Sequence, residues 1–295
     1  MPTNSADSRK RVTNSRRKPE TIAPPARSVE VTGVTEWQGG KISKFEDYLV
    51  GEEPLEIRIG ARSISVTMRT PGHDLELASG FLLTEGVITG CEQMAGLRQI
   101  TDRGHKRNVV RVDLVRGVRI DPALLQRHFV ASSSCGLCGK ASIDAVRVRG
   151  ITRPNPDLRV SPELFCLLPD LLRSSQTLFG RTGGLHAAGL FEPVGSLLAL
   201  REDVGRHNAV DKLIGWAALE NRLPLSESIM LVSGRGSFEI VQKALVAGIP
   251  IVACVSAPSS LAVQLAWEFN LTLIGFLRGK RFVVYTGEDR LRMGA

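Results

Sequence analysis

Apolar and polar residues alternate along the first part of the chain in a way that predicts paired strands. Residues 54–68 alternate between the two kinds of side chain on either side of Gly60, which is typical of a hairpin of two half-buried strands. Residues 73–86 then change to helical spacing, and Gly86 is the expected end of that helix. Further strands are expected at residues 108–115 and, broken by Gln38-Gly39-Gly40, within residues 29–50.

The second part of the chain alternates apolar strands with helices. Strands are expected at residues 128–134, 185–191, 196–200, 228–233, 249–256 and 271–277. Helices are expected at residues 139–148, 205–221, 238–248 and 259–270. Because apolar strands that alternate with helices form sheets covered on both faces, we expect an α/β arrangement with a parallel or mixed sheet.

This change of pattern divides the chain into three segments. Residues 1–28 contain Pro, Ser, Asn and charged residues without periodicity, so we expect a disordered basic tail. Residues 29–130 are expected to form a smaller N-terminal α+β domain, and residues 131–295 an α/β domain. The predicted fold class is therefore α/β, or α+β for the chain as a whole.

Composition and charge are those of an ordinary globular protein. Of the 295 residues, 43% are hydrophobic, and no apolar run approaches the roughly 20 residues that cross a bilayer. The N-terminus lacks the apolar stretch of a secretory signal, so we expect a cytoplasmic protein with no membrane partner. The net charge is +8, of which the tail supplies +5 from seven basic and two acidic side chains. The tail has no aromatic side chain to stack on bases, so we expect a solvated segment and no nucleic-acid partner.

The most informative short stretch is SSSCGLCGK, residues 132–140, in which two residues separate Cys135 from Cys138. Such a pair can hold a metal, form a disulfide or carry sulfur as a persulfide. At a helix N-terminus the helix dipole and the free backbone N–H groups lower the pKa of a thiol and make it a nucleophile. The odd number of cysteines, five, favours a reducing compartment over a disulfide scaffold, and the apolar runs around Cys166 and Cys254 predict that both are buried.

Two other functions use the same pair of cysteines. A structural zinc site needs four ligands, and the chain has no second Cys-x-x-Cys, although His186 or His207 could complete a three-ligand site. A zinc deaminase needs a glutamate two positions after its histidine ligand, and Ala188 at that position argues against deaminase chemistry. A thiol–disulfide oxidoreductase of thioredoxin type has its pair near the start of a chain of about 100 residues, whereas here the pair is in mid-chain.

Four glycine-rich polar loops predict a phosphate-binding site. They are residues 181–189, 202–212, 233–239 and 276–281. Glycine lets the backbone approach a phosphate, and arginine and helix N-terminal N–H groups bind it. In an open sheet such loops gather at the strand ends, so we expect a phosphate-bearing ligand next to the reactive thiol. The candidate ligands in the first three loops are His186, Arg206, His207 and Arg235.

Longer motifs extend this pattern along the chain. They are MRTPGHDLELASGFLLTEGVI (68–88), SSSCGLCGK (132–140), TGGLHAAGL (182–190), EDVGRHNAVDKLIG (202–215), SGRGSFEIVQKALVAGIPI (233–251), SAPSSLAVQLA (256–266) and LTLIGFLRGKRFVVYT (271–286). Together they resemble the FdhD/NarQ family of sulfur carrier proteins required for formate dehydrogenase activity. The resemblance runs from about residue 54 to 286. Two positions depart from the family pattern, namely His73, where an acid is usual, and Ser259, where threonine is usual.

The resemblance implies a sulfurtransferase with a cytidine-deaminase-like domain and no permanently bound metal. It implies a cysteine desulfurase as sulfur donor, formate dehydrogenase as the enzyme served, and Mo-bis(molybdopterin guanine dinucleotide) as the bound substrate that accepts sulfur. Cys135 is then the expected persulfide carrier, and Cys138 the second catalytic cysteine, which stabilises the loop, relays sulfur or releases it. The family's cofactor-binding segment corresponds to Phe276, Leu277, Arg278, Gly279, Lys280 and Arg281.

The expected acceptor is large and roughly two-fold, with a guanine nucleotide at each end. A single α/β domain offers one mouth at its strand ends, whereas a two-fold dimer offers two. We therefore expect a homodimer with a site for a guanine nucleotide moiety on each protomer.

Overall fold

The computed structural model describes residues 27–102, 105–120, 151 and 153–292. The expected strand at 128–134 and helix at 139–148 lie outside these residues, as do Cys135 and Cys138. Arg27 and Ser28, which the sequence assigns to the tail, pack against the body: Arg27 pairs with Glu53, and the fully buried Ser28 accepts a 2.9 Å hydrogen bond from the N–H of Gly51. The boundary between the two expected domains, near residue 130, also lies outside the described residues.

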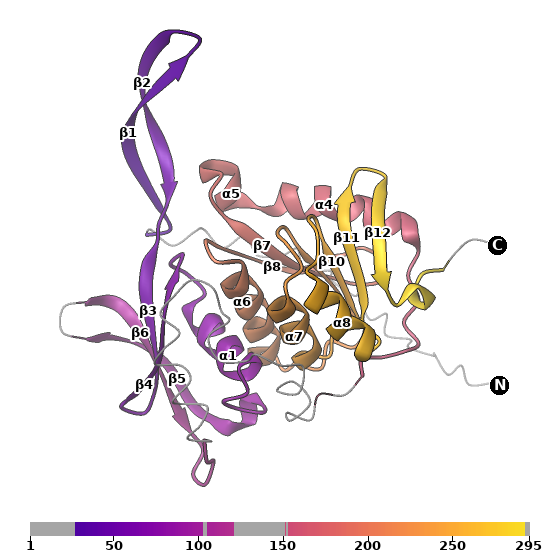
Figure 1. The fold of residues 1–295 in the computed structure, drawn as a ribbon. Coiled ribbons are helices and arrows are strands. Elements are labelled where there is room, and N and C mark those ends of the chain that lie inside the picture. The colour runs from indigo at the N-terminus through magenta and orange to yellow at the C-terminus, as the bar shows by residue number, and fades with distance from the viewer. Residues whose placement is uncertain (1–26, 103–104, 121–150, 152, 293–295) are drawn as a thin grey trace, which may run out of the picture.

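The described residues form an α/β fold with three sheets, which confirms the predicted fold class (Figure 1). The strands are β1 (Val29–Gln38), β2 (Lys41–Val50), β3 (Glu53–Ile59), β4 (Arg62–Arg69), β5 (Met94–Asp102), β6 (His105–Leu114), β7 (His186–Phe191), β8 (Leu197–Asp203), β9 (Ile229–Val232), β10 (Ile251–Cys254), β11 (Thr272–Arg278) and β12 (Arg281–Thr286). The helices are α1 (Asp74–Thr84), α4 (Pro162–Ser175), α5 (Thr177–Thr182), α6 (Arg206–Leu219), α7 (Phe238–Val246) and α8 (Ser260–Glu268), with short 3₁₀ turns η1 (Cys91–Gln93) and η2 (Glu288–Arg290).

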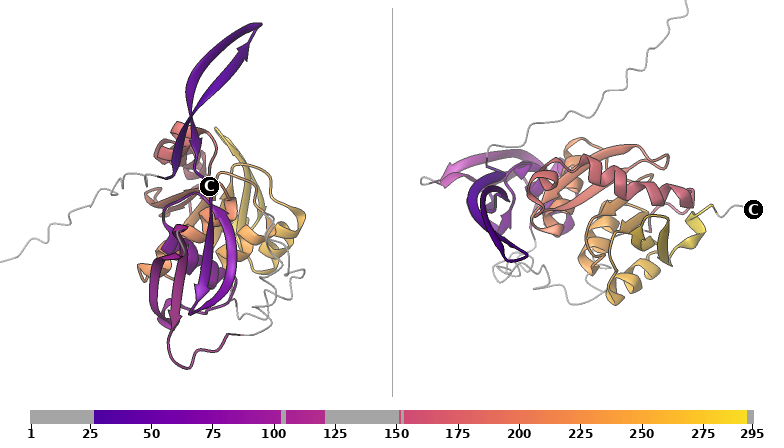
Figure 2. Two further views of the ribbon diagram at one scale, coloured as in Figure 1. Left: turned by 90° about the vertical axis from the view of Figure 1, so that its left-hand side faces the viewer. Right: turned by 90° about the horizontal axis from the view of Figure 1, so that it is seen from above.

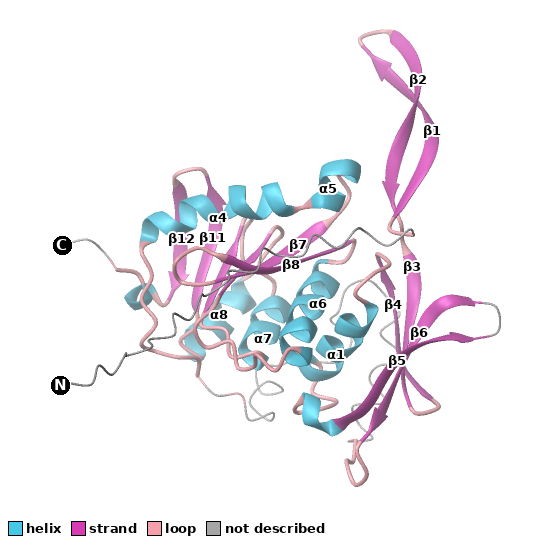
Figure 3. Cartoon of the chain, turned by 180° about the vertical axis from the view of Figure 1, so that it is seen from behind, coloured by secondary structure: helices cyan, strands magenta, loops and turns pink. Residues whose placement is uncertain are grey.

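The largest sheet has six strands in the order β12-β11-β10-β9-β7-β8 and is covered on both faces (Figure 3). Strands β9, β10 and β11 run parallel, and β7, β8 and β12 pair antiparallel with their neighbours, so the predicted mixed sheet is confirmed. Successive side chains of a strand point to opposite faces. Ala188 of β7 therefore packs into the core formed with α6, α7 and α8, whereas Ala187 packs into the core formed with α4.

A smaller sheet in the order β4-β3-β6-β5 packs against α1. The predicted hairpin at 54–68 is confirmed as β3 and β4, and Gly60 takes the left-handed conformation in its turn, with φ 59°. The predicted helix is confirmed as α1, and Gly86 follows its end with φ 67°.

The remaining hairpin, β1 and β2, is longer than the short strands expected and projects from the body (Figures 1 and 2). Its ten residue pairs run in unbroken register from Val29 and Val50 to Gln38 and Lys41. Gly39 and Gly40 form the turn at the tip, both with positive φ, as residues at this position of a tight hairpin require.

Helices α1 and α6 cross with their backbones in contact and join the two larger sheets. A Cβ atom at Gly80 would lie 1.9 Å from the carbonyl oxygen of Asp211, and one at Gly215 would lie 1.8 Å from that of Glu76. Any side chain at either position would push the helices apart. These two glycines therefore set the distance between the small sheet and the large one.

We predict that Gly80→Ala lowers the free energy of unfolding by about 2–3 kcal/mol, because the added methyl group overpacks a backbone contact. Urea unfolding followed by circular dichroism measures the change. Gly180→Ala is the matched control, because Gly180 also lies in a helix but a Cβ there meets nothing within 4 Å. The control should leave stability unchanged or raise it slightly, since alanine is the better helix former. Equal stability of the two variants would contradict the tight crossing.

Candidate functional site

Sheet topology brings the predicted polar loops to the same end of the strands in the six-stranded sheet, and we call this end the edge. Strands β9, β10 and β11 end at this edge, β7 begins there because it runs antiparallel to β9, and β8 ends there beside β7. In Figure 1 the turn between β11 and β12 at this edge is at the top of the view. Neighbouring strands lie about 4.8 Å apart, so the three steps from β11 to β7 span roughly 14 Å. The predicted gathering of these loops at the strand ends is confirmed.

His186, Gly234 and Arg206 meet where β7, β9 and α6 converge. A Cβ at Gly234 would lie 3.4 Å from His186 Nδ1 and 3.9 Å from Arg206 Cδ. Ser233 fixes the contact, because its hydroxyl accepts a 2.9 Å hydrogen bond from the N–H of Ala187 and its own N–H donates to the Ala187 carbonyl at 3.0 Å. Burial lowers the pKa of His186, and the positive charge of Arg206 lowers it further.

Arg206 is the first residue of α6, and its Nε atom is buried without a hydrogen-bond partner among the residues that the structure describes. A buried guanidinium N–H without an acceptor is costly, so such a group in a native site calls for a bound partner. An arginine at a helix N-terminus is suited to a phosphate, because the free backbone N–H groups and the helix dipole also favour an anion there.

His207 follows Arg206 and points toward the start of α7. Its Nε2 atom lies 3.2 Å from Ser237 Oγ and 3.8 Å from a carboxylate oxygen of Glu239. Burial lowers the pKa of His207 to about 3, with further lowering by the positive charges of Lys243 and Arg206. At neutral pH the imidazole is therefore uncharged, and it offers a hydrogen bond rather than a charge to a ligand.

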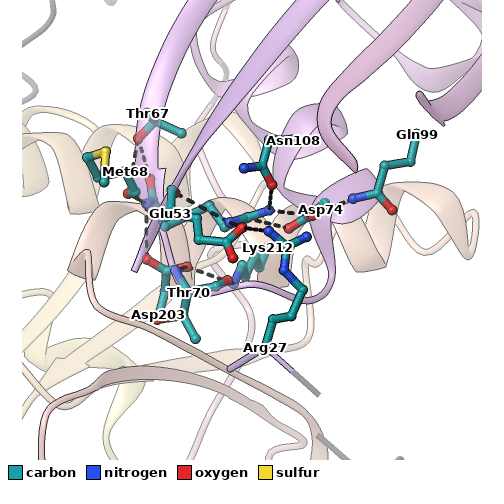
Figure 4. Close-up of polar contacts among 12 residues, drawn as sticks. Arg27, Glu53, Thr67, Met68, Thr70, Asp74, Gln99, Asn108, Asp203 and Lys212 are labelled. Atoms are coloured by element: carbon teal, nitrogen blue, oxygen red, sulfur yellow. Dashed lines mark hydrogen bonds and ion pairs between the residues drawn. The ribbon is translucent and has the colours of Figure 1, made fainter. Parts of the chain in front are cut away.

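The loop of residues 203–208 is fixed by contacts with the segment before α1 (Figure 4). Lys212 Nζ lies 2.7 Å from Asp203 and donates to the Thr70 carbonyl at 2.8 Å, and Thr70 N–H donates to Asp203 at 3.1 Å. Asn208 bridges the same carboxylate, at 3.0 Å, and the carbonyl of Met68, at 2.8 Å. These bonds hold the start of α6, and therefore Arg206 and His207, in place.

A neighbouring loop that the sequence analysis did not select as a ligand loop lies between β10 and α8. The N–H of Ser256 donates to the Gly234 carbonyl at 3.4 Å, and that of Ser259 donates to the Gly236 carbonyl at 2.9 Å. Gly236 is required here, because a Cβ would lie 2.7 Å from the sulfur of Cys254. The signal in the sequence is an apolar strand followed by SAPSS and a helix, which matches the pattern of the 233–239 loop. Arg235, at the tip of that loop, is exposed.

Residues 276–281 form the end of β11, its turn and the start of β12. Phe276 is exposed and has a φ of 51°, which is rare for an aromatic residue, and it lies in an irregular part of the β11–β12 ladder. Its N–H donates to the Ser256 carbonyl at 3.2 Å, which links this segment to the neighbouring loop. The side chain of Leu277 is fully buried against α4, so this residue presents its backbone to the edge.

The turn itself concentrates positive charge. Arg278, Gly279, Lys280 and Arg281 are all exposed, and Gly279 makes the turn with φ 53°. Arg278 and Arg281 are directly opposite each other in the ladder. Like charges in directly opposed positions destabilise a hairpin, and an anion bound between them would relieve this repulsion.

Two of the three described cysteines, Cys91 and Cys254, are poor candidates for a nucleophile. Cys254 is fully buried, and burial raises its pKa to about 12. Burial also raises the pKa of Cys91, at the start of η1. Cys166, in α4, is partly exposed, so the prediction that it is buried is wrong, whereas that for Cys254 is confirmed.

The residues that the structure describes show neither a candidate metal site nor a candidate membrane span. They contain no group of three or more His, Cys, Asp or Glu side chains placed to hold a metal ion. Within the same residues, no helix has both the length and the apolar character needed to cross a membrane. The pair Cys135 and Cys138 lies outside them, so the zinc alternative is decided by experiment below.

The model of the FdhD/NarQ family matches residues 50–292. This chain belongs to the FdhD/NarQ family. A relative from Streptomyces coelicolor named sulfur carrier protein FdhD is 54% identical over 262 residues, which cover 87% of this chain and 93% of the relative. A protein of the same name from Sulfolobus acidocaldarius is 42% identical and covers 90% of this chain and 98% of its own length. The predicted family is confirmed.

A crystal structure from Desulfotalea psychrophila, described as that of a formate dehydrogenase accessory protein, shares the fold. It superposes with a TM-score of 0.71 at 24% identity, over 89% of this chain and 99% of its own.

The two departures from the family pattern are accommodated locally. Ser259 caps α8 by accepting a 3.3 Å hydrogen bond from the N–H of Ala262, and His73 pairs with Glu76 at 3.2 Å.

The lowered pKa of His207 predicts a loss of stability in acid. In the unfolded chain this imidazole takes up a proton as the pH falls below its usual value of 6.5, whereas in the folded chain it stays neutral until about pH 3. The unfolded state therefore binds one more proton in this window, and the free energy of unfolding falls with pH by up to about 1.4 kcal/mol per unit. His207→Gln should lose this component, which urea unfolding at pH 4, 5, 6 and 7 would measure. Parallel pH profiles of the two proteins would show that His207 is not a neutral buried group.

Proposed function

We propose that this protein is a sulfur carrier that takes sulfur from a cysteine desulfurase as a persulfide on Cys135. It delivers that sulfur to Mo-bis(molybdopterin guanine dinucleotide), which binds at the edge formed by the loops of the six-stranded sheet. The enzyme served is a formate dehydrogenase, and the protein acts as a homodimer with one guanine nucleotide site on each protomer.

The observation that carries this proposal is that the chain belongs to the FdhD/NarQ family. Relatives at 42–54% identity over nearly their whole length are named sulfur carrier protein FdhD. Two of the described cysteines add support, because burial shifts the pKa values of Cys91 and Cys254 away from the thiolate form. A persulfide carrier needs an accessible thiolate. Cys135 and Cys138 are the pair with the small polar surroundings that suit this role.

Loading is a thiol exchange in which atoms and electrons balance. The thiolate of Cys135 attacks the outer sulfur of the persulfide on the desulfurase. A new S–S bond forms at Cys135, the S–S bond of the donor breaks, and the donor cysteine leaves as a thiolate. No external oxidant or reductant is needed for this step.

Delivery removes the outer sulfur from Cys135, and Cys138 has three candidate roles in it. In release, the thiolate of Cys138 attacks the inner sulfur at Cys135, a disulfide forms between the two cysteines, and the outer sulfur leaves as sulfide. In relay, the outer sulfur passes to Cys138 as a second persulfide. In the third role, Cys138 stabilises the loop and exchanges no bond. The Cys138→Ser variant below separates the first two roles, in which Cys138 exchanges bonds, from the third, in which it does not.

The edge of the sheet suits the phosphate and guanine parts of the acceptor. Among the residues that the structure describes, Arg206 has a buried N–H without an acceptor, and an anion would relieve the repulsion between the opposed Arg278 and Arg281. Burial keeps the imidazoles of His186 and His207 neutral, so they add hydrogen bonds without adding charge. The edge extends over roughly 14 Å from β7 to β11, which suits an extended dinucleotide better than a single free phosphate.

Cys135→Ser should abolish persulfide formation, and with it formate dehydrogenase activity in the cell. The assay is intact-protein mass spectrometry after incubation with cysteine desulfurase and cysteine, where loading adds the mass of one sulfur atom. Cys138→Ser should still load. If Cys138 releases or relays sulfur, this variant retains the persulfide in the presence of acceptor. Cys166→Ser is the matched control, because Cys166 is a partly exposed cysteine in α4, and it should load like wild type.

Persulfide still formed on the Cys135→Ser variant would contradict the assignment. Two other outcomes would favour the alternative functions. One tightly held zinc per chain that is lost with either cysteine would indicate a metal site. Rapid turnover of a Cys135–Cys138 disulfide with small thiols, without sulfur loading, would indicate a thiol–disulfide oxidoreductase.

The double variant Arg278→Ala/Arg281→Ala should bind GDP about 100-fold more weakly than wild type, as measured by calorimetry. Each charge-assisted phosphate contact is worth roughly 1.5–3 kcal/mol, and ~1.4 kcal/mol corresponds to a tenfold change in affinity. Arg116→Ala/Arg119→Ala is the matched control, because both arginines are exposed, have the same spacing and remove the same charge. Its affinity should be unchanged at moderate salt. Equal affinity of the two double variants would remove residues 276–281 from the nucleotide site.

A further inference from the structure

Four arginine and lysine side chains are buried in the part of the chain that the structure describes, and one of them has no carboxylate partner. Three are paired at 2.7–2.8 Å, namely Arg69 with Asp74, Lys212 with Asp203, and Lys243 with Asp211. The fourth is Arg290 of η2, which is 0% exposed and forms no ion pair with any described residue. Arg290 is therefore the exception among the buried cations.

The contacts of the Arg290 guanidinium are few and neutral. Its Nε atom donates to the carbonyl of Asn155 at 3.0 Å, and its Nη1 atom donates to the hydroxyl of Thr272 at 3.2 Å. That hydroxyl can accept the bond because its own hydrogen goes to the Gly287 carbonyl, at 2.7 Å. The Nη2 atom is buried and has no acceptor among the described residues.

This arrangement leaves a positive charge inside the protein without compensation. Burial lowers the pKa of Arg290, the negative charge of Asp289 offsets this in part, and the positive charge of Arg159 lowers the pKa further. Arginine nevertheless stays protonated in proteins. A buried charge without a counter-ion and a buried N–H without an acceptor are each costly. Both costs are removed by one anion placed at Nη2.

Arg290 lies at the opposite end of the six-stranded sheet from the edge. Its partner Thr272 is the first residue of β11, whereas Arg278, in the cationic turn of the edge, is the last. In Figure 1 this end is the lower end of β12, near the C-terminus. Strand β11 has seven residues, and a strand rises about 3.3 Å per residue, so roughly 20 Å separate Arg290 from the edge. The uncompensated charge is therefore separate from the proposed nucleotide site.

The segment that covers Arg290 is held to the same turn by backbone hydrogen bonds. The N–H of Val160 donates to the Arg290 carbonyl at 2.9 Å, and the N–H of Arg292 donates to the Val160 carbonyl at 2.9 Å. The outer side of this segment is in solvent, because Pro156 and Asp157 are exposed. A displacement of residues 155–159 alone would give an ion access to the guanidinium. Because Arg290 is fully covered, the site suits a monatomic anion better than a phosphate or a carboxylate.

We propose that Arg290 binds a chloride ion, and that the ion fixes residues 155–160 to the turn after β12. The chloride accepts the hydrogen bond of Nη2 and balances the buried charge. The positive charge of Arg159 adds to its attraction. The site stabilises the fold at this end of the sheet, and it depends neither on the sulfur chemistry nor on the nucleotide edge.

Thermal unfolding in sodium chloride, with sodium gluconate added to keep the ionic strength constant, tests this site in the full-length protein. Above the dissociation constant, each tenfold increase in chloride should raise the Tm of wild type by about 3 °C. Arg290→Met should abolish this dependence. Arg292→Met is the matched control, because Arg292 is an exposed arginine two residues along the chain, and it should keep the dependence.

Two further measurements make the result specific to Arg290. The double variant Arg278→Ala/Arg281→Ala should keep the chloride dependence, which shows that the ion does not act at the edge. Crystals grown in bromide should show an anomalous scattering peak within hydrogen-bond distance of Arg290 Nη2. This peak also decides the matter if Arg290→Met does not fold, as judged by circular dichroism.

Three results would overturn the proposal. They are a wild-type Tm that is the same in chloride and in gluconate, a chloride dependence that persists in folded Arg290→Met, and the lack of a bromide peak beside Nη2. Any of them would mean that Nη2 is satisfied by water and that Arg290 serves only to hold Asn155 and Thr272.

Discussion

The backbone contact between α1 and α6 holds the site in its working shape. Gly80 and Gly215 let the two helices approach until carbonyl oxygens of one lie where a Cβ of the other would be. Beside this crossing, buried Lys243 of α7 lies 2.8 Å from Asp211 of α6 and donates to Thr84 of α1 at 2.8 Å. Removing one partner of a buried ion pair costs about 3–5 kcal/mol, so the three helices are fixed as one unit.

The position of α6 in turn fixes the anion-binding edge. Its first turn carries Arg206 and His207, and the bonds that tie Asp203 and Lys212 to Thr70 hold that turn. His207 also lies within the field of Lys243, which helps to keep its pKa near 3. The small sheet and α1 therefore help to position the residues of the edge, although they supply none of its candidate ligands.

Much of the fold follows from the sequence because its signals are local. Apolar runs and helical spacing identified β9, β10, β11 and the helices between them, and glycine marked the turns at Gly60 and Gly86. The loops at the edge were also predictable, because parallel strands place their ends together. The elements that were missed have mixed signals. Helix α4 has Pro169 within it, and β5 has Gly96 near its start.

Long-range pairings could not be predicted. Nothing in the neighbouring sequence shows that Lys243 and Lys212 are buried, because a lysine in a helix is ordinarily exposed. The acids that pair with them, Asp211 and Asp203, lie in other elements of the chain. The depressed pKa of His207 depends on the same burial. The length and exposure of the hairpin of β1 and β2 could likewise not be predicted, because residues 29–50 indicated only short strands broken at Gln38-Gly39-Gly40.

The most direct test of the sulfur-carrier account is a single-turnover transfer of radioactive sulfur. The protein is loaded with labelled persulfide, separated from the desulfurase, and mixed with purified Mo-bis(molybdopterin guanine dinucleotide). The account predicts that the label leaves the protein and appears on the cofactor, and that this transfer slows when excess GDP competes for the edge of the sheet. Label that remains on the protein, or that is lost as free sulfide at the same rate without cofactor, would contradict it.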